Sequence, residues 1–344
     1  MLRALAQHDD GKVRGPALGS LLVSERLRGR RDAFTYMGAV TLANPTGTKR
    51  RTIYDAQQQP NLPGKLVRSE NSPKSKKDRY VNEAYDYSGA TYDFYEKVFG
   101  RKSIDGKGMR LDSTVHYREN AAEAFDNAFW DGSQMIYGDG DAVIFDRFTK
   151  CLDVVGHELT HGVTQYEAGL AYHGQSGALN ESFSDVFGSL VKQWKKGEKA
   201  DKADWLIGAG LLVKGKINGV ALRSMKAPGT AYDDPQLGGK DPQPDHMKNY
   251  VKLSDTDSGD WGGVHLNSGI PNHAFYLAAT AIGGFAWEKA GLIWYDALCN
   301  QTRADSQFSD AATATSNVAA NKYGNGSKEH NAVKDAWKAV GVVK

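Results

Sequence analysis

The stretch Asp153-Val-Val-Gly-His157-Glu158-Leu-Thr-His161 decides the fold, and it lies within residues 148–166. Apolar side chains recur there every three or four residues, which predicts a helix with one stripe in a core: Phe148, Leu152, Val155, Leu159, Val163 and Tyr166. His157 and His161 lie one helical turn apart, so two imidazoles can share one metal ion. Glu158 projects about 100° round the helix, where it can reach a metal-bound water. This is the geometry that a zinc hydrolase needs.

The His-Glu-x-x-His string is only a moderate signal by itself. It is expected by chance in roughly one chain of this length in a hundred. A coincidental pair of histidines on a solvated helix face therefore stays open until a third ligand is found.

A second predicted helix, beginning near Leu179, supplies that ligand. Glu181 can complete a two-His, one-Glu set, leaving the fourth position to water. Asp185 follows one turn later on the same face and can accept the second ring N–H of a ligating histidine. The alternative is that Asn180-Glu181-Ser182 merely caps a helix start, and this would be preferred without the histidine pair.

Composition limits the class of protein. The chain has 344 residues, 40% of them hydrophobic, which favours two domains over one. A formal net charge of +2 argues against a nucleic-acid or membrane-surface binder. Cys151 and Cys299 suggest neither a disulfide framework nor a cysteine metal site, and Cys151 is expected in the core. No apolar run reaches membrane-span length and no signal-peptide core follows Met1, so a cytoplasmic location or non-classical export is expected.

The chain divides into four predicted parts. Residues 1–48 form a basic arm and linker, read either as a solvated extension or as a propeptide ending in a cleavable linker. Residues 49–150 are strand-rich, 151–166 form the central helix, and 167–344 are helical. We therefore predict a two-lobed α+β protein with its cleft at the central helix.

Individual elements follow from periodicity. Strands are predicted at 51–56, 65–69 and 113–118, and helices at 80–99, 271–282, 287–300, 309–323 and 328–340. A hairpin is predicted over 125–137, and its first strand could pair with an extended peptide if it lies at an edge; an ordinary edge strand is the simpler interpretation. Gly156 and Gly162 flank the histidines, which indicates either close packing or flexibility.

The motifs together resemble the thermolysin family of zinc endopeptidases. Besides residues 157–161 and 180–185, the matching motifs are Asn127-Ala-Phe-Trp130, Ala221-Leu-Arg-Ser-Met225 and Gly262-Gly-Val-His-Leu-Asn-Ser-Gly269. The likeness runs from about Arg51 through nearly the whole chain. It is closest to the protealysin-like branch, whose members carry a short propeptide, and residues 1–48 resemble such a propeptide that starts late. The resemblance also implies a bacterial source.

The resemblance implies roles for the site residues. Zinc would be held by His157, His161 and Glu181, lowering the pKa of its bound water and polarising the scissile carbonyl. Glu158 would act as general base and then protonate the leaving amine. The oxyanion donors that match are His265 and Tyr172, with Asp260 orienting His265.

Substrate contacts are implied in the same way. Asn127 and the Ala128 backbone would pair with the peptide main chain, and Arg223 would hold the carbonyl on the leaving-group side. The matching pocket residues are apolar: Phe145, Phe148, Val154 and Leu222. Burying a Leu or Phe side chain there contributes roughly 1.5 to 3 kcal/mol, so cleavage before bulky hydrophobic residues is expected.

The chain departs from the family at its double calcium site. Asp153 and Asp204 remain, but the other matching positions are Lys192, Leu206 and Ala209. Because Ca²⁺ needs six to eight oxygen ligands, calcium is doubtful here, and we expect the Lys192 ammonium in its place. The expected cofactor is zinc.

Two functions from different classes follow. The first is a neutral zinc endopeptidase acting on peptides or proteins and made as an autoprocessed precursor. The second is an inactive, zinc-stabilised peptide-binding protein. Glu158, His265 and Tyr172 favour the enzyme, since a binding module needs neither a base nor an oxyanion donor.

Overall fold

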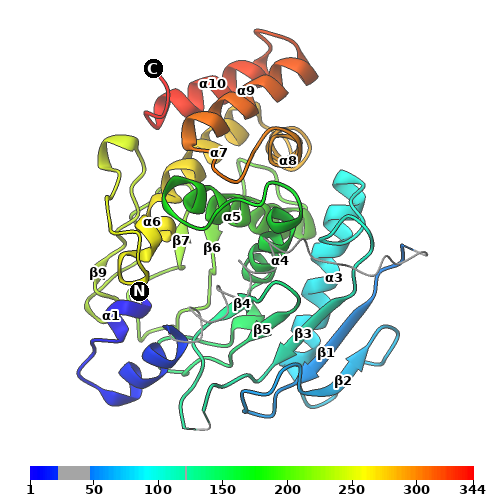
Figure 1. The fold of residues 1–344 in the computed structure, drawn as a ribbon, viewed down its shortest axis with the longest axis vertical. Coiled ribbons are helices and arrows are strands. Elements are labelled where there is room, and N and C mark those ends of the chain that lie inside the picture. The colour runs from blue at the N-terminus through cyan, green and yellow to red at the C-terminus, as the bar shows by residue number, and fades with distance from the viewer. Residues whose placement is uncertain (22–46, 121) are drawn as a thin grey trace.

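The computed structural model describes residues 1–21, 47–120 and 122–344 (Figure 1). A sheet-containing lobe and a mainly helical lobe meet at two central helices, α4 (Leu152–Tyr166) and α5 (Gly174–Lys196). This is the predicted two-lobed α+β architecture. The division of the chain into four parts, with boundaries after residues 48, 150 and 166, stays a prediction.

In the part of the chain that the structure describes, the first lobe contains a five-stranded sheet in the order β2-β1-β3-β5-β4. Its strands are β1 (Arg51–Asp55), β2 (Lys65–Ser69), β3 (Leu111–Val115), β4 (Ala128–Trp130) and β5 (Met135–Tyr137). The pairs β1/β3 and β3/β5 are parallel, while β1/β2 and β4/β5 are antiparallel. Helix α3 (Arg79–Phe99) packs on β1 and β3. Among the described residues, the hairpin β4/β5 places β4 at the edge of this sheet, the position at which an extended peptide can add as a further strand.

One strand prediction is shifted. Residues 113–118 were expected as a strand, but β3 ends at Val115. His116 adopts φ 56°, a left-handed conformation that extended backbone cannot include, so the strand stops before it.

Helix α4, which carries His157 and His161, begins later than the apolar stripe from Phe148 predicts. Phe148–Lys150 form a 3₁₀ turn, Cys151 is extended with φ −105° and ψ 111°, and α4 begins at Leu152. Val155, Leu159 and Val163 are fully buried as expected. Phe148 therefore packs from the preceding turn rather than from the helix, and buried Cys151 lies before the helix.

Helix α5 starts earlier than predicted, at Gly174 rather than near Leu179. Glu181 therefore lies inside the helix, and the interpretation of Asn180-Glu181-Ser182 as a helix start is wrong. Gly156 of α4 faces Gly188 of α5, where an added Cβ would lie 3.1 Å from the Gly188 Cα. A Cβ at Gly188 would lie 2.4 Å from the Asp153 carbonyl oxygen. Close packing of the two helices is thus the reason for glycine at these positions.

The second lobe contains five further helices. They are α6 (Asp260–Asn267), α7 (Gly269–Ile282), α8 (Ala290–Asn300), α9 (Phe308–Tyr323) and α10 (Lys328–Ala339). Four two-residue strands also lie there, so the lobe is not entirely helical as predicted: β6 (Leu206–Ile207), β7 (Arg223–Ser224), β8 (Asp233–Asp234) and β9 (Gly239–Lys240). Within the described residues, every helix is too short or too polar to cross a membrane.

The start of the chain packs against the body of the protein. Helix α1 (Leu2–Leu5) contacts the 3₁₀ turn η2 (Pro235–Leu237), and residues 11–21 are helical (Figure 1). Leu5, Val13 and Ala17 are buried in the main core. The solvated-arm alternative is therefore wrong for residues 1–21, while most of the predicted linker lies outside the described residues.

Candidate active site

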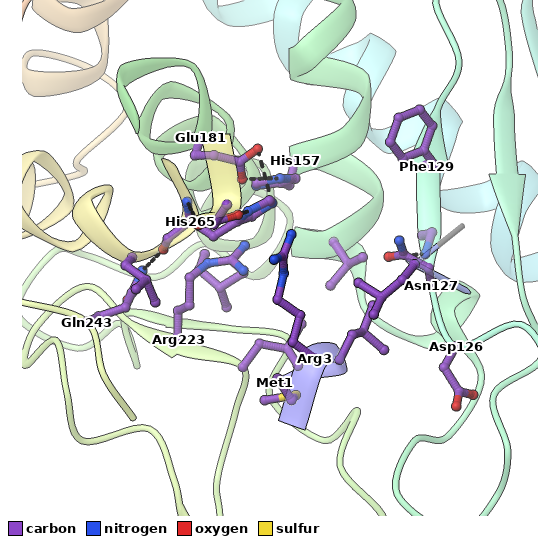
Figure 2. A pocket seen from close by; sticks show the side chains of 18 of the residues that line it. Met1, Arg3, Asp126, Asn127, Phe129, His157, Glu181, Arg223, Gln243 and His265 are labelled. Atoms are coloured by element: carbon purple, nitrogen blue, oxygen red, sulfur yellow. Dashed lines mark hydrogen bonds and ion pairs between the residues drawn. The ribbon is translucent and has the colours of Figure 1, made fainter. Parts of the chain in front are cut away.

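Three buried side chains converge between the central helices. Nε2 of His157 and Nε2 of His161 lie 3.1 Å apart, both from α4. Glu181 of α5 reaches them with Oε2 at 3.4 Å from His157 Nε2 and Oε1 at 3.5 Å from His161 Nε2 (Figure 2). Burial disfavours the charged form of Glu181, but the nearby histidines outweigh it and hold its pKa well below the usual range. Two imidazole nitrogens and one ionised carboxylate fit a zinc ion.

The outer ring nitrogens are also held. Asp185 Oδ1 lies 2.8 Å from Nδ1 of His157. Asn180 Oδ1 lies 2.8 Å from Nδ1 of His161, and the Ser184 hydroxyl lies 3.1 Å from it. An Nδ1–H that donates outward leaves the Nε2 lone pair for the metal. The predicted contact of Asp185 is present, whereas sequence reasoning gave Asn180 and Ser184 no such contact.

Glu158 stands beside the metal ligands rather than among them. Its Oε1 lies 3.9 Å from His157 Nε2, and its Oε2 accepts the backbone N–H of Trp130 at 3.2 Å. The carboxylate thus lies between the three ligands and the edge strand β4. This position suits a base acting on a water next to the metal.

A second group of polar side chains closes the site from the other lobe. Asp260 Oδ1 lies 2.6 Å from His265 Nδ1, and Asp260 Oδ2 accepts the His265 backbone N–H at 2.9 Å. Both bonds depend on a sharp turn, because residues 260–263 all adopt positive φ. The Tyr172 hydroxyl lies 3.1 Å from His265 Nε2 and donates to Glu181. Two potential donors therefore meet at the metal site.

A cavity of about 410 Å³ runs along these residues. The predicted substrate-binding residues all line it: Asn127, Ala128, Phe145, Phe148, Val154, Leu222 and Arg223. Residues that the sequence did not indicate line it too, among them Ile207 and Tyr232. Arg223 donates from Nε and an NH₂ group to the two oxygens of Asp185 at 2.8 and 2.7 Å. Asn272, which sequence reasoning missed, donates to Asp185 at 2.8 Å. The structure thus gathers every predicted site residue around one cleft.

The sequence matches two known family models, and both belong to metallopeptidases, as the geometry of the site suggests. Residues 33–165 match the thermolysin metallopeptidase catalytic domain, and residues 168–342 match the thermolysin metallopeptidase alpha-helical domain. The chain belongs to the thermolysin family. It is a zinc-dependent neutral endopeptidase, and the alternative of an inactive binding protein is not supported.

Relatives of this thermolysin-family chain are similar over most of its length. An "Extracellular metalloprotease" of Pectobacterium carotovorum is 56% identical, covering 87% of this chain and 82% of that protein. A "Thermolysin" of Alicyclobacillus acidocaldarius is 41% identical, covering 90% of this chain and 54% of that protein. The solved precursor of protealysin from Serratia proteamaculans is 52% identical with a TM-score of 0.87, covering 99% of this chain and 97% of that one.

The start of this thermolysin-family chain enters its own cleft. Met1, Leu2, Arg3 and Leu21 line the same cavity as the metal ligands (Figure 2). Arg3 forms an ion pair of 3.2 Å with Asp257, three residues before Asp260. The Ser20 hydroxyl accepts the backbone N–H of Asp126 at 2.7 Å. A peptide entering the cleft would have to displace these residues.

Proposed function

We propose that the enzyme cleaves before bulky hydrophobic residues, with Glu158 as general base. The observation that carries this proposal is the place of Glu158 between the ligand atoms of His157, His161 and Glu181 and the edge strand β4. Zinc held by those three residues would act as a Lewis acid, polarising the scissile carbonyl and acidifying a water molecule. Glu158 takes the proton from the attacking water and passes it to the leaving amine.

Two further residues stabilise the negative charge that develops on the carbonyl oxygen. The Tyr172 hydroxyl and His265 Nε2 lie 3.1 Å apart, so both can donate to one oxygen. Asp260 accepts from His265 Nδ1 at 2.6 Å and so fixes the ring with Nε2 facing the Tyr172 hydroxyl. This supports the assignment of His265 and Tyr172 as donors and of Asp260 as the residue that orients His265.

The cleft walls support the proposed substrate preference. Asn127 and Ala128 lie at the start of the edge strand, where an extended peptide can add as a further strand. Arg223, fixed by Asp185, holds the carbonyl on the leaving-group side. Phe145, Phe148, Val154 and Leu222 form an apolar wall, and a Leu or Phe side chain buried there contributes roughly 1.5 to 3 kcal/mol.

A quenched peptide with Leu or Phe after its single scissile bond tests this proposal. Cleavage before that residue should stop when zinc is removed by a chelator and return when zinc is restored. A matched peptide with Gly at the same position should be cleaved at least 10-fold more slowly, because about 1.4 kcal/mol corresponds to tenfold. Equal cleavage of both peptides would contradict the assigned pocket.

We also propose that residues 1–48 act as an inhibitory propeptide. The support is that Met1, Leu2, Arg3 and Leu21 occupy the cleft and that Arg3 is paired with Asp257. Activity should appear only as the pro-segment is cut, followed by intact-mass analysis alongside the peptide assay. A chain of unchanged mass with full activity would contradict this.

We also propose that the ammonium of Lys192, near the end of α5, takes the place of calcium. Its Nζ lies 2.8 Å from Asp153, 2.9 Å from Asp204 and 2.6 Å from the Leu206 carbonyl oxygen. Burial disfavours the charged form, but Asp153 and Asp204 outweigh it and raise the pKa of Lys192. An ammonium so placed occupies the carboxylate oxygens that a calcium ion would need. Two bound calcium ions beside Asp153 would overturn this.

A further inference from the structure

The cleft wall contains an acid that the mechanism does not use. Asp126 directly precedes Asn127, lines the cavity, and is only 2% exposed. The Asp126 carboxylate accepts the backbone N–H of Asp141, but among the described residues its Oδ1 has no hydrogen-bond partner and no lysine, arginine or histidine pairs with it. Burial, helped by the charge of Asp141, raises the pKa of Asp126 to about 8. A buried carboxylate oxygen without a partner is costly unless something else binds it.

A second carboxylate oxygen beside it is also unpartnered. Asp141 Oδ1 accepts the backbone N–H groups of Val143, Ile144 and Phe145 at 2.8 to 2.9 Å, which fixes the side chain. Its Oδ2 is buried without a hydrogen-bond partner among the described residues. Asp141 does not line the cavity itself but adds its charge beside Asp126, and neither carboxylate is paired with a lysine, arginine or histidine among the described residues.

Backbone contacts place Asp126 relative to the proposed pocket. The Gly138 N–H donates to the Asn127 carbonyl at 2.9 Å, and the Phe148 N–H donates to the Gly138 carbonyl at 3.3 Å. Asp126 therefore lies at the end of the edge strand that adjoins Phe148, whereas Trp130, at the other end, donates to Glu158. An extended peptide advances about 3.3 Å per residue, so its next residues beyond the pocket pass Asp126.

The described part of the pro-segment covers Asp126 without balancing its charge. The Ser20 hydroxyl accepts the backbone N–H of Asp126, and neighbouring Leu21, which also lines the cavity, is apolar. Once this cover leaves, water enters and the carboxylate ionises more readily, since burial is the main cause of its neutral form. The open cleft then presents an anionic group with room for a partner.

We propose that Asp126 is a specificity-determining residue that selects a lysine or arginine at the second position after the scissile bond. This inference rests on the proposed function, because it uses the same strand pairing and the same pocket. A cationic side chain there can donate to the free Asp126 oxygen in a charge-assisted hydrogen bond, supported by Asp141. A glutamate at the same position would face two like charges and be rejected.

Three quenched peptides test the inference. They share one scissile bond and a Leu after it, and differ only in Lys, Leu or Glu at the next position. The zinc-loaded full-length chain is used, and rates are measured after the rate of cleavage of the Leu peptide has become constant. The ratio of kcat/KM for Lys over Glu should be about tenfold or more at low salt and should fall as salt is added.

Variants identify the residue responsible. Asp126→Asn should bring the Lys/Glu ratio close to one, whereas Asp126→Glu, which keeps a carboxylate, should retain a preference for Lys. Asp201→Asn is the matched control, since its side chain is 65% exposed and does not line the cleft, and its ratio should equal that of the parent. The ratio is taken within each variant, so a change in overall activity does not affect it.

The outcomes separate the inference from the proposed function. A parent enzyme that cleaves the Leu peptide but shows no Lys/Glu preference would overturn the role of Asp126 and leave the endopeptidase proposal standing. A preference that is unchanged in Asp126→Asn would do the same. A zinc-loaded, processed chain that cleaves none of the three peptides would contradict the proposed function and, with it, this inference.

Discussion

The carboxylate of Asp185 connects His157 to Arg223. Its Oδ1 lies 2.8 Å from Nδ1 of His157 and 2.7 Å from the Arg223 guanidinium, and its Oδ2 binds Arg223 Nε at 2.8 Å. Burial disfavours its charge, but Arg223 and His157 outweigh burial and hold the pKa of Asp185 well below its usual range. One buried anion thus orients both a proposed metal ligand and a proposed substrate contact.

Asp185→Asn should weaken zinc binding about 10- to 100-fold, because His157 loses the anionic acceptor that orients its ring. Competition with a chelator of known affinity measures this. Asn272→Ala removes one neutral donor from Asp185 and keeps the carboxylate, so its effect should be smaller. Equal zinc affinity in parent and Asp185→Asn would show that the contact does not support the metal site.

Lys192→Met should lower the free energy of unfolding by about 3 to 5 kcal/mol, because it leaves the buried carboxylate of Asp153 without its cation. Denaturant unfolding measures the change. Lys202→Met is the control: its side chain is 76% exposed and pairs with Asp201, so a change within about 0.5 kcal/mol is expected. Equal losses in both variants would contradict the buried role of Lys192.

His116 should make stability fall as the pH rises. Its Nδ1 lies 2.8 Å from Asp139 and its Nε2 lies 3.1 Å from Asp78. Burial opposes its charge, but these carboxylates outweigh burial and raise the pKa of His116 from 6.5 to about 9. The proton is held more tightly in the folded chain, so the stabilisation is complete below pH 6.5 and is lost between pH 6.5 and 9.

Unfolding of the parent and of His116→Gln at pH 6 and pH 9 measures this effect. The parent should lose up to about 3 kcal/mol more than the variant over that interval. The same pH dependence in both proteins would exclude His116 as its source.

The packing of residues 11–21 gives a test of inhibition by the pro-segment. Ala17 is fully buried, whereas its neighbour Leu18 is 45% exposed. Ala17→Asp places an uncompensated charge in the interface and should release the segment, so that peptide cleavage begins without a lag. Leu18→Asp introduces the same charge in solvent and should keep the lag of the parent. Identical progress curves for the two variants would contradict a role for this packing.

Local periodicity was enough to predict the helix that holds His157 and His161, because both the apolar stripe and the histidine spacing are properties of one segment. It could not fix where α4 begins, since Phe148 continues the stripe from a 3₁₀ turn. The early start of α5 was missed because its first residues, from Gly174, carry no apolar periodicity. The sequence pattern therefore located the stripe better than the helix ends.

Contacts between segments were the hardest to predict. Asn180 and Ser184 bind His161 only because α4 and α5 pack closely at Gly156 and Gly188. The contact of Asn272 with Asp185 joins residues that are far apart in the chain. The order of the motifs carried the family resemblance, but tertiary packing decides which polar side chains orient the ligands.

The most direct test of the account is zinc-loaded Glu158→Gln. The variant should bind zinc like the parent, because Glu158 lies outside the ligand set. Its cleavage of the peptide with Leu after the scissile bond should fall about 10²- to 10⁴-fold, since glutamine cannot accept the proton of the attacking water. A metal-bound Glu158→Gln protein that cleaves the peptide as fast as the parent would contradict the central claim.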